Sequence, residues 1–291
     1  MPIFNTTISG GGTTPTGSIS ITSNGTYDVT DKATAVVNVP TTAPALYREF
    51  QLDNTGKLIP NTTITHIIDF TGVTDVSDYA LARAYSNNTA ISGAVDMSDL
   101  TTISGSQACG NMFSSCTGLT SAGLSSLTTI SGSNACNGMF SGCTGLTSFD
   151  LSALTTVSGS QACNSMFNGC TGLTSANLPA LTTISGGNGC NSMFSGCTGL
   201  TSADLSGLTA IGGSNACNYM FSGCTSLATV YIGGTTAIDF GTRTNQFNIM
   251  FNGCTQNIDV YAPAASQAKI EAFSGYPNFG GTGTVTWHWR S

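Results

Sequence analysis

The sequence is poor in charge. Only 7% of its 291 residues are charged, whereas soluble domains commonly reach about 25%. The net charge is −7, and no lysine or arginine lies between Arg83 and Arg243. This long stretch cannot neutralise phosphates, which argues against nucleic-acid binding. Glycine, serine, threonine and asparagine fill the polar positions instead.

Long apolar runs are also missing. No run of 18 or more apolar residues occurs, so no segment predicts a membrane span. The first twelve residues, MPIFNTTISGGG, lack the basic start and apolar core of a secretory signal. We therefore expect a protein that leaves its cell by a route other than the general secretory one, or stays inside until lysis.

Groups that could carry catalysis are few. The two histidines, His66 and His288, lie far apart, and no base accompanies the many serines. A nucleophilic site would need a nucleophile, a base and an orienting partner. Carboxylates are scattered, and Asp150 and Asp204 hold the same repeat position with Asn177 between them, which predicts an exposed polar row. We expect no enzymatic activity and no bound cofactor or metal.

What the sequence does contain is a repeat. The stretch from Cys109 to Cys224 returns every 27 residues, and a period of this size predicts a solenoid whose coils bury their apolar faces against their neighbours. The same Met-Phe-x-x-Cys phrase marks each coil, and we expect it to form a buried structural spine. Its residues are Met112, Phe113, Cys116, Met139, Phe140, Cys143, Met166, Phe167, Cys170, Met193, Phe194, Cys197, Met220, Phe221, Cys224, Met250, Phe251 and Cys254.

The pattern inside one repeat predicts two kinds of structure. Cys109, Met112, Phe113 and Cys116 lie at i, i+3, i+4 and i+7, which indicates one face of a short helix. An extended piece follows, and stacked extended pieces would form a parallel ladder. The expected fold is thus an α/β solenoid of leucine-rich-repeat-like coils of 27 residues, each a short helix plus a parallel strand. The glycine at 118 and its equivalents at 145, 172 and 199 would reverse the chain with a positive φ.

The rest of the chain divides around this solenoid. A degenerate first repeat aligns Tyr85 with Phe113, and the last coil is stretched by three residues before Cys254. A strand is expected at 258–261, then a helix opening at Pro263 and Ser266, then a strand at 282–289. The predicted units are a flexible arm at 1–17, a small β module at 18–45, N-terminal cap strands at 46–75, the solenoid at 76–261 and a C-terminal cap at 262–291.

Ten of the eleven cysteines form pairs spaced by seven residues, and Cys254 stands alone. Seven residues of helix span about 10.5 Å, whereas a disulfide needs Cα atoms within about 7 Å, so a bond within a pair is excluded if the helix forms. Buried free thiols, disulfides between coils and a metal site stay open. The absence of accompanying histidine or carboxylate favours buried thiols, since cysteine packs as a small hydrophobe.

Threonine dipeptides also recur, at 101–102, 128–129, 155–156 and 182–183. A regular threonine array on a flat solenoid can bind ice. Ice binders place their threonines on one face, whereas adjacent strand residues point to opposite faces. Strand propensity and bonding of the hydroxyls to the backbone are therefore the favoured explanation.

The Met-Phe-x-x-Cys-x-x-Leu-Thr-Ser phrase resembles the bacterial surface-antigen type of leucine-rich repeat, the BspA-like family. The resemblance covers about 81–261. It implies a solenoid used for cell-surface adhesion and host interaction, and hence binding rather than catalysis. The second cysteine of each repeat, at Cys109 and its equivalents, departs from the family pattern.

A second resemblance lies near the N-terminus. Residues 21–29 (ITSNGTYDV) and 35–39 (AVVNV) resemble a short β module common in structural proteins of bacteriophages that infect gut Gram-positive bacteria. With the absent signal, this favours a non-enzymatic virion protein of fibre or decoration type. It would attach to other virion proteins through its N-terminal region and adhere at the virion surface to a host-surface or mucosal glycan or protein. A bacterial cell-surface adhesin and a ligand-free structural spacer are the alternatives, and a homo-oligomer stays open.

Overall fold

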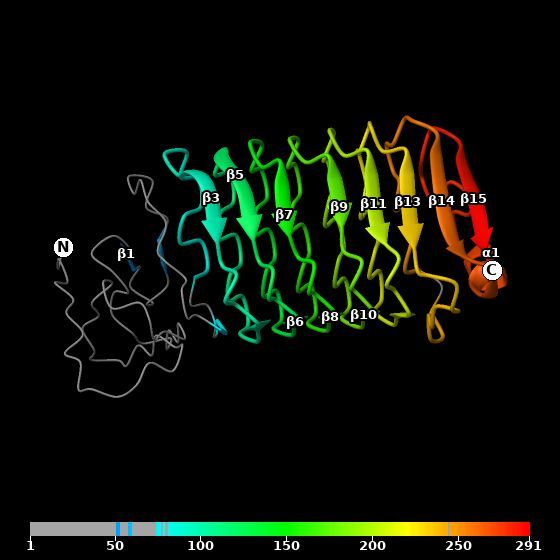
Figure 1. Cartoon of the computed structure of the whole chain (residues 1–291), viewed down its shortest axis with the longest axis horizontal. Coiled ribbons are helices and arrows are strands. Elements are labelled where there is room, and N and C mark those ends of the chain that lie inside the picture. Colours follow the sequence, from blue (N-terminus) through cyan, green and yellow to red (C-terminus); the bar gives the residue numbers. More distant parts are fainter. Residues whose placement is uncertain (1–50, 53–57, 60–73, 77, 79–80, 244) are drawn as a thin grey trace.

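The computed structural model describes residues 51–52, 58–59, 74–76, 78, 81–243 and 245–291. The predicted arm at 1–17 and β module at 18–45 lie outside these residues, as does most of the predicted cap at 46–75. Within 46–75, β1 (Gln51–Leu52) and β2 (Leu58–Ile59) form an antiparallel pair. From residue 81 onward the chain is a row of stacked coils (Figure 1).

Each coil contributes one strand to a long parallel ladder, as the sequence predicts (Figure 1). The first sheet has three strands: β3 (Ser92–Asp96), β5 (Gly118–Gly123) and β7 (Ser148–Asp150). The next has five: β9 (Ser175–Asn177), β11 (Ser202–Leu205), β13 (Thr229–Ile232), β14 (Ile258–Pro263) and β15 (Val285–Arg290). We call the outward side of these strands the β face.

A second parallel ladder of two-residue strands runs along the solenoid. Its strands are β4 (Thr102–Ile103), β6 (Thr129–Ile130), β8 (Thr156–Val157), β10 (Thr183–Ile184) and β12 (Ala210–Ile211). Neighbours pair in register at the repeat spacing, so that Thr156 lies between Thr129 and Thr183. The coils are therefore joined by backbone hydrogen bonds along two separate ladders.

The first ladder is interrupted between β7 and β9, and one substitution marks the break. Phe149 takes the strand position that Ala122 and Ala176 hold in the neighbouring coils. Its ring is half-buried and stacks on Phe167 and Phe194, with centroids 4.5 and 5.8 Å apart. The break in the ladder thus coincides with the strand that carries phenylalanine in place of alanine.

The predicted helix of each coil is wrong. Residues 105–115 and their equivalents are a chain of overlapping β-turns, and in the described residues the helices are η1 (Ala264–Ser266) and α1 (Gln267–Glu271). Alternate amides close a turn, as Met112 N does to Cys109 O at 3.1 Å. The amides between them bond to the next coil, as Cys109 N does to Ala135 O at 2.8 Å. The fold is therefore a β-solenoid of about 27-residue coils with little helix.

The physical reason is the left-handed backbone at every fourth residue. In the second coil these residues are Gln107, Asn111 and Ser115, with φ of 50, 53 and 61°. A helix cannot contain such residues, since left-handed backbone breaks its right-handed path. A four-residue turn period also places i, i+3, i+4 and i+7 on one side, so the apolar pattern alone could not distinguish it from the 3.6-residue helix.

The predicted role of the glycine after each turn segment is also wrong. Gly118, Gly145, Gly172 and Gly199 are not among the residues with positive φ. They are required by close approach between coils, because a Cβ on Gly145 would lie 2.3 Å from Thr117 O in the preceding coil.

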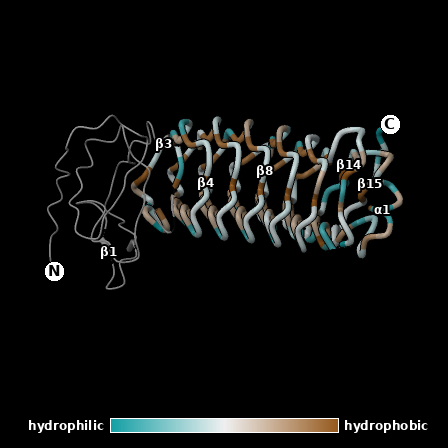
Figure 2. Tube along the Cα trace, turned by 90° about the horizontal axis from the view of Figure 1, so that it is seen from below, coloured by the Kyte–Doolittle hydropathy of each residue, from teal (hydrophilic) through white to brown (hydrophobic). Residues whose placement is uncertain are grey.

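The core is one continuous apolar column, which Figure 2 shows as hydrophobic segments that recur in every coil. Tyr85 of the degenerate first repeat stacks on Phe113 at 5.1 Å, as the alignment of these two residues predicts. At the other end the predicted helix and final strand are present as η1 with α1 and as β15. Trp287 and Trp289 of β15 pack against the core and close it.

Candidate binding surface

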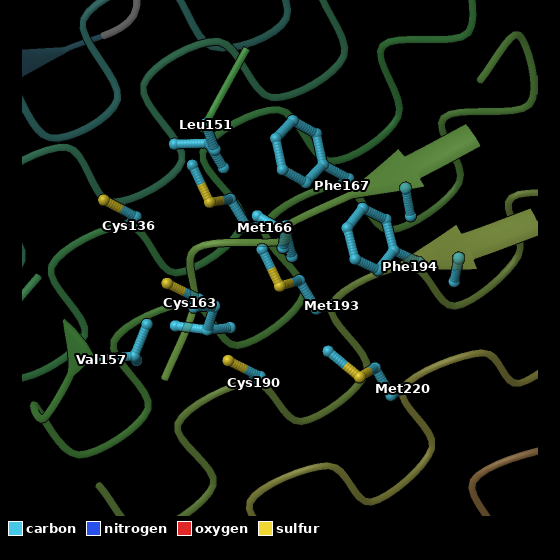
Figure 3. Close-up of a cluster of buried hydrophobic side chains, with 14 of the residues drawn as sticks. Cys136, Leu151, Val157, Cys163, Met166, Phe167, Cys190, Met193, Phe194 and Met220 are labelled. Carbon is cyan, nitrogen blue, oxygen red and sulfur yellow. The ribbon is translucent and has the colours of Figure 1, made fainter. Parts of the chain in front are cut away.

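The spine residues lie in the interior. All eighteen side chains from Met112 to Cys254 have 0% exposure, and Figure 3 shows the methionine and phenylalanine side chains of successive coils side by side. Six ring pairs run from Tyr85 to Phe251, with centroids 5.1–6.2 Å apart and planes within 12°. A ligand cannot reach these groups, so binding must use the exposed faces.

The cysteines are also interior. All eleven are buried, unpaired thiols. The cysteine of each Met-Phe-x-x-Cys phrase donates through Sγ to a carbonyl of the preceding coil, as Cys143 does to Phe113 O at 3.0 Å. Burial raises the pKa of Cys116 and Cys254 to about 11 and that of Cys143 and Cys197 to about 12. Thiols held protonated in this way are poor nucleophiles and poor metal ligands.

The aspartates of the β face accept hydrogen bonds within the turns that follow their strands. Asp96, Asp150 and Asp204 each accept a hydrogen bond from the amide two residues later, at 2.9, 3.0 and 2.9 Å. The bonds from Ser152 lower the pKa of Asp150. Asp204 lies beside Asn177 in register, whereas Asp150 pairs with Gly123 in the other sheet. The carboxylates thus hold the backbone beyond each strand.

The hydroxyls of the recurring threonines form hydrogen bonds within the solenoid. The first threonine of each dipeptide donates to a carbonyl 27 residues earlier, as Thr128 does to Thr101 O at 3.0 Å. The expectation that adjacent threonines point to opposite faces is wrong in two coils. The hydroxyl oxygens of Thr155 and Thr156 lie 3.4 Å apart, and those of Thr182 and Thr183 lie 3.5 Å apart. The ladder strands are only two residues long, so these dipeptides sit where the extended backbone begins.

Aromatic and charged side chains gather at the C-terminal end of the β face. Tyr231, Tyr261 and His288 lie in one row across β13, β14 and β15, with rings 4.9 and 4.6 Å apart. His288 thus lies outside while Trp287 and Trp289 face the core, as their alternation predicts. We call Tyr231, Tyr261, His288, Asp259 and Arg290 the aromatic end of the β face.

The aromatic end carries both signs of charge. His288 Nε2 lies 2.8 Å from Asp259 Oδ1, and these side chains are 41% and 54% exposed. The Arg290 guanidinium lies 5.5 Å from the Tyr231 ring centroid and donates to Gly233 O. A half-buried row of rings with phenol, imidazole, carboxylate and guanidinium groups can bind a polar ligand by stacking, hydrogen bonds and charge.

Tyr231, Tyr261 and Arg290 are not among the residues predicted from the sequence to be functional. The signal was the repeat itself, because Tyr231 follows Asp204 by one repeat and so occupies the outward strand position already identified. His288 was recognised only by its alternation with tryptophan.

The opposite edge of each coil, formed by the turn segments, is covered by neutral polar groups. We call it the turn face. Asparagine side chains bond to one another there, as Asn137 does to Asn134 and Asn191 to Asn188, both at 3.2 Å. The described residues include no helix long and apolar enough to cross a membrane, and no group of three or more histidine, cysteine or acidic residues that could hold a metal ion.

Comparison with solved structures finds leucine-rich repeat proteins. One is a leucine-rich repeat protein from Bacteroides ovatus, at 16% identity and a TM-score of 0.41, covering 84% of this chain and 71% of that one. Another is a leucine rich cell surface protein from Faecalibacterium prausnitzii, at 12% identity and a TM-score of 0.20, covering 83% and 93%. A search of curated proteins finds no match.

The sequence itself matches a family model. Six copies of the BspA type leucine rich repeat region match, over residues 62–162 and 111–248. The resemblance of residues 18–39 to a phage module gains no such support. Because the matched region covers more than half of the sequence, the chain belongs to the BspA type leucine-rich repeat family.

Proposed function

We propose that this chain is a non-enzymatic binding protein of the bacterial cell surface, which holds a host-surface or mucosal ligand on its exposed solenoid faces. Membership in the BspA type family supports a surface role. The architecture supports binding, because stacked coils give an extended rigid surface fixed by a continuous buried column. Adhesion by such a surface needs no moving part and no reactive group.

The aromatic end of the β face is the observation that carries this proposal. Most of the solenoid surface is neutral, but here stacked rings meet an exposed carboxylate, an imidazole and a guanidinium within three adjacent strands. Aromatic and arginine side chains dominate the energy of binding surfaces because they combine large contact area with directed polar groups. We therefore place the main ligand contact at this end.

The non-enzymatic part of the proposal rests on how the candidate groups are used. Cysteine thiols are buried with raised pKa, and the aspartates of the β face accept bonds from turn amides. His288 pairs with Asp259 on an open surface. Such a surface does not exclude water from a reacting centre, as catalysis commonly requires.

The virion hypothesis is less well supported. It depends on residues 18–39 and on attachment to other virion proteins through the N-terminal region, both of which lie outside the described residues. The family match favours the adhesin alternative instead.

Binding of the fluorescently labelled full chain to epithelial cells and to mucin-coated wells tests this function. We expect saturable binding, and at least a tenfold loss of affinity in the double variant Tyr231→Ser, Tyr261→Ser. Thr128→Ser, on the second ladder, keeps its hydroxyl and serves as the control that retains binding. If the chain binds saturably to neither surface, or if a hydrolytic activity copurifies with it, the proposal is refuted.

A further inference from the structure

One position of the turn face departs from the repeat in the last two coils. It holds small or short polar residues in four earlier coils, namely Asn111, Gly138, Ser165 and Ser192. In the last coil it is the half-buried Ile249, with a φ of 47°, and in the coil before that it is Tyr219, whose side chain is 36% exposed. It is the exposed large hydrophobic residue of the described part of the chain.

The backbone at this position is unfavourable for tyrosine. Tyr219 has a φ of 53°, in the left-handed region that glycine and asparagine tolerate and bulky residues seldom adopt. Such strain persists only where the surroundings enforce it, and it often marks a functional position. Serine and glycine, present in the preceding coils, would fit the same turn with less strain.

Tyr219 also leaves a buried polar atom without a partner. In the two preceding coils the serine hydroxyl donates to the asparagine before it, Ser165 to Asn164 Oδ1 and Ser192 to Asn191 Oδ1, both at 2.8 Å. Tyrosine cannot make this short bond, and Asn218 Oδ1 is buried without a hydrogen bond. An unpaired buried acceptor destabilises the fold.

The bonding between coils is weakened at the same point. Cys217 N donates to Gln246 O and Phe221 N to Met250 O, both at 3.0 Å, which continues the ladder on either side. Within the described residues, Tyr219 N makes no corresponding bond. The exposed ring therefore stands at a left-handed φ that the neighbouring coils share, and at a site where side-chain bonding and the ladder between coils are both worse than in the preceding coils.

We propose that Tyr219 anchors a binding site for a neutral saccharide on the turn face. An exposed aromatic ring offers an apolar surface for the C–H face of a sugar ring, and its phenol offers a hydrogen bond at the edge. The neighbouring polar groups are hydroxyls and amides, among them Ser192, Ser222 and Asn252, which match sugar hydroxyls as donors and acceptors. This combination of one ring and several uncharged polar groups is suited to a glycan.

Charge argues against an ionic ligand. No lysine or arginine occurs between Arg83 and Arg243 in the sequence, so the coils on the N-terminal side of Tyr219 offer no counter-charge to a sulfated or sialylated glycan. Arg243 of the last coil reaches back to the coil of Tyr219, where its guanidinium donates to Ser214 Oγ at 2.6 Å. The proposal is independent of the aromatic end of the β face and of where the protein is located.

The test compares the wild-type full chain with Tyr219→Ser, which restores the residue found in the two preceding coils. The probe is a glycan array that carries neutral oligosaccharides ending in galactose, mannose or N-acetylglucosamine beside sialylated and sulfated ones. We expect the wild type to bind neutral members and Tyr219→Ser to lose at least tenfold in affinity. We also expect the melting temperature of Tyr219→Ser to equal or exceed that of the wild type, because the Asn218 bond is regained.

A control variant separates the effect of the Tyr219 ring from the effect of a substitution at this repeat position in general. Asn111→Ser changes the same repeat position four coils away and should bind as the wild type does. Equal glycan binding by Tyr219→Ser, preferential binding of anionic glycans, or no glycan binding by the wild type would each overturn the proposal. A protein ligand captured through Tyr219 in place of a glycan would overturn the ligand class. A fall in melting temperature of Tyr219→Ser would overturn the functional explanation of the ring, since it would show a structural role.

Discussion

At the residue scale, the molecule is defined by side chains that repeat at fixed positions and bury completely. Each of the five coils from Cys109 to Cys224 adds one methionine, one phenylalanine and two cysteines to the column, packed between the equivalent residues of the neighbouring coils. Cysteine suits the tightest positions because it is small and apolar, and its Sγ–H satisfies a carbonyl such as Tyr85 O at 3.0 Å. The same burial that lets cysteine pack in the core suppresses the reactivity of its thiol.

The thiols predict a pH dependence of stability. Burial raises the pKa of Cys116 and Cys254 to about 11, above the value near 8.5 of an unfolded thiol. Between these values the unfolded chain releases protons that the folded chain keeps, so the free energy of unfolding falls as pH rises. We expect full stability below about pH 8 and a steep loss from pH 9 to 11. Urea denaturation across this range measures it, and an unchanged midpoint would contradict the account.

The same burial predicts that the thiols are protected. In the native chain, a thiol-specific alkylating reagent at pH 8 should modify few of the eleven cysteines, and after denaturation it should modify all of them. Mass spectrometry of both samples counts the labels. Failure to label the denatured, unreduced chain would reveal disulfides in place of free thiols.

The phenylalanine column predicts a large cost for a single truncation. Phe167 is fully buried between Phe140 and Phe194 and also contacts Phe149. We expect Phe167→Ala to lower the free energy of unfolding by about 3–5 kcal/mol, measured by chemical denaturation. The exposed position Thr147, in the preceding coil, gives a matched control, and Thr147→Ala should cost far less. A loss below about 1 kcal/mol in Phe167→Ala would contradict a rigidly packed column.

At the element scale, each coil is two short strands joined by a chain of turns. The turns are as regular as a helix, but half of their amides bond to the next coil, so this segment is itself a third ladder between coils. This bonding brings the coils close together, so only glycine fits where the backbones of neighbouring coils meet. One repeat position shows this at Gly132, Gly159 and Gly186. A Cβ on any of these residues would lie 2.0–2.1 Å from a carbonyl oxygen of the preceding coil.

This contact between coils predicts a sharp contrast between two neighbouring glycines. Gly186→Ala would place its Cβ 2.0 Å from Gly159 O, and the coils must separate to admit it. Gly187→Ala meets nothing within 4 Å and should be nearly neutral. We expect Gly186→Ala to lower the free energy of unfolding by about 1–3 kcal/mol or more. Thermal melts of the two variants compare them directly, and equal melting temperatures would show that the contact between coils is loose.

The sequence contains enough information to predict the period, the ladder of strands and the buried spine, because each depends on apolar residues at fixed spacing. It could also have revealed the turns. Asn134, Gly138 and Gly142 recur at four-residue spacing, and asparagine and glycine favour left-handed backbone. Read alone, the apolar spacing of Cys109 to Cys116 fits a helix equally well. Tyr231 and Tyr261 escaped notice because exposure depends on register across coils rather than on local pattern.

At the scale of the whole molecule, the seven coils form a rigid support with two different exposed faces. The β face ends in stacked aromatic and charged groups, and the turn face carries amides, hydroxyls and the single ring of Tyr219. A solenoid of this kind gains stability from contacts between adjacent coils, so the faces are free to vary. The departures at Tyr219 and Tyr231 lie on the outer faces, whereas Phe149 packs its ring against the spine.

The central claim is that function resides on these faces and stability in the spine. Cell binding and melting temperature, measured together on one panel of full-length variants, test it most directly. The panel holds Tyr231→Ser with Tyr261→Ser for the β face and Met166→Leu for the spine. The account predicts that the face variant loses at least tenfold in binding affinity while its melting temperature stays within a few degrees of the wild type. It also predicts that Met166→Leu alters the melting temperature, and that this variant still binds at temperatures where it is folded. Binding that survives in the face variant, or that follows only the melting temperature across the panel, would contradict it.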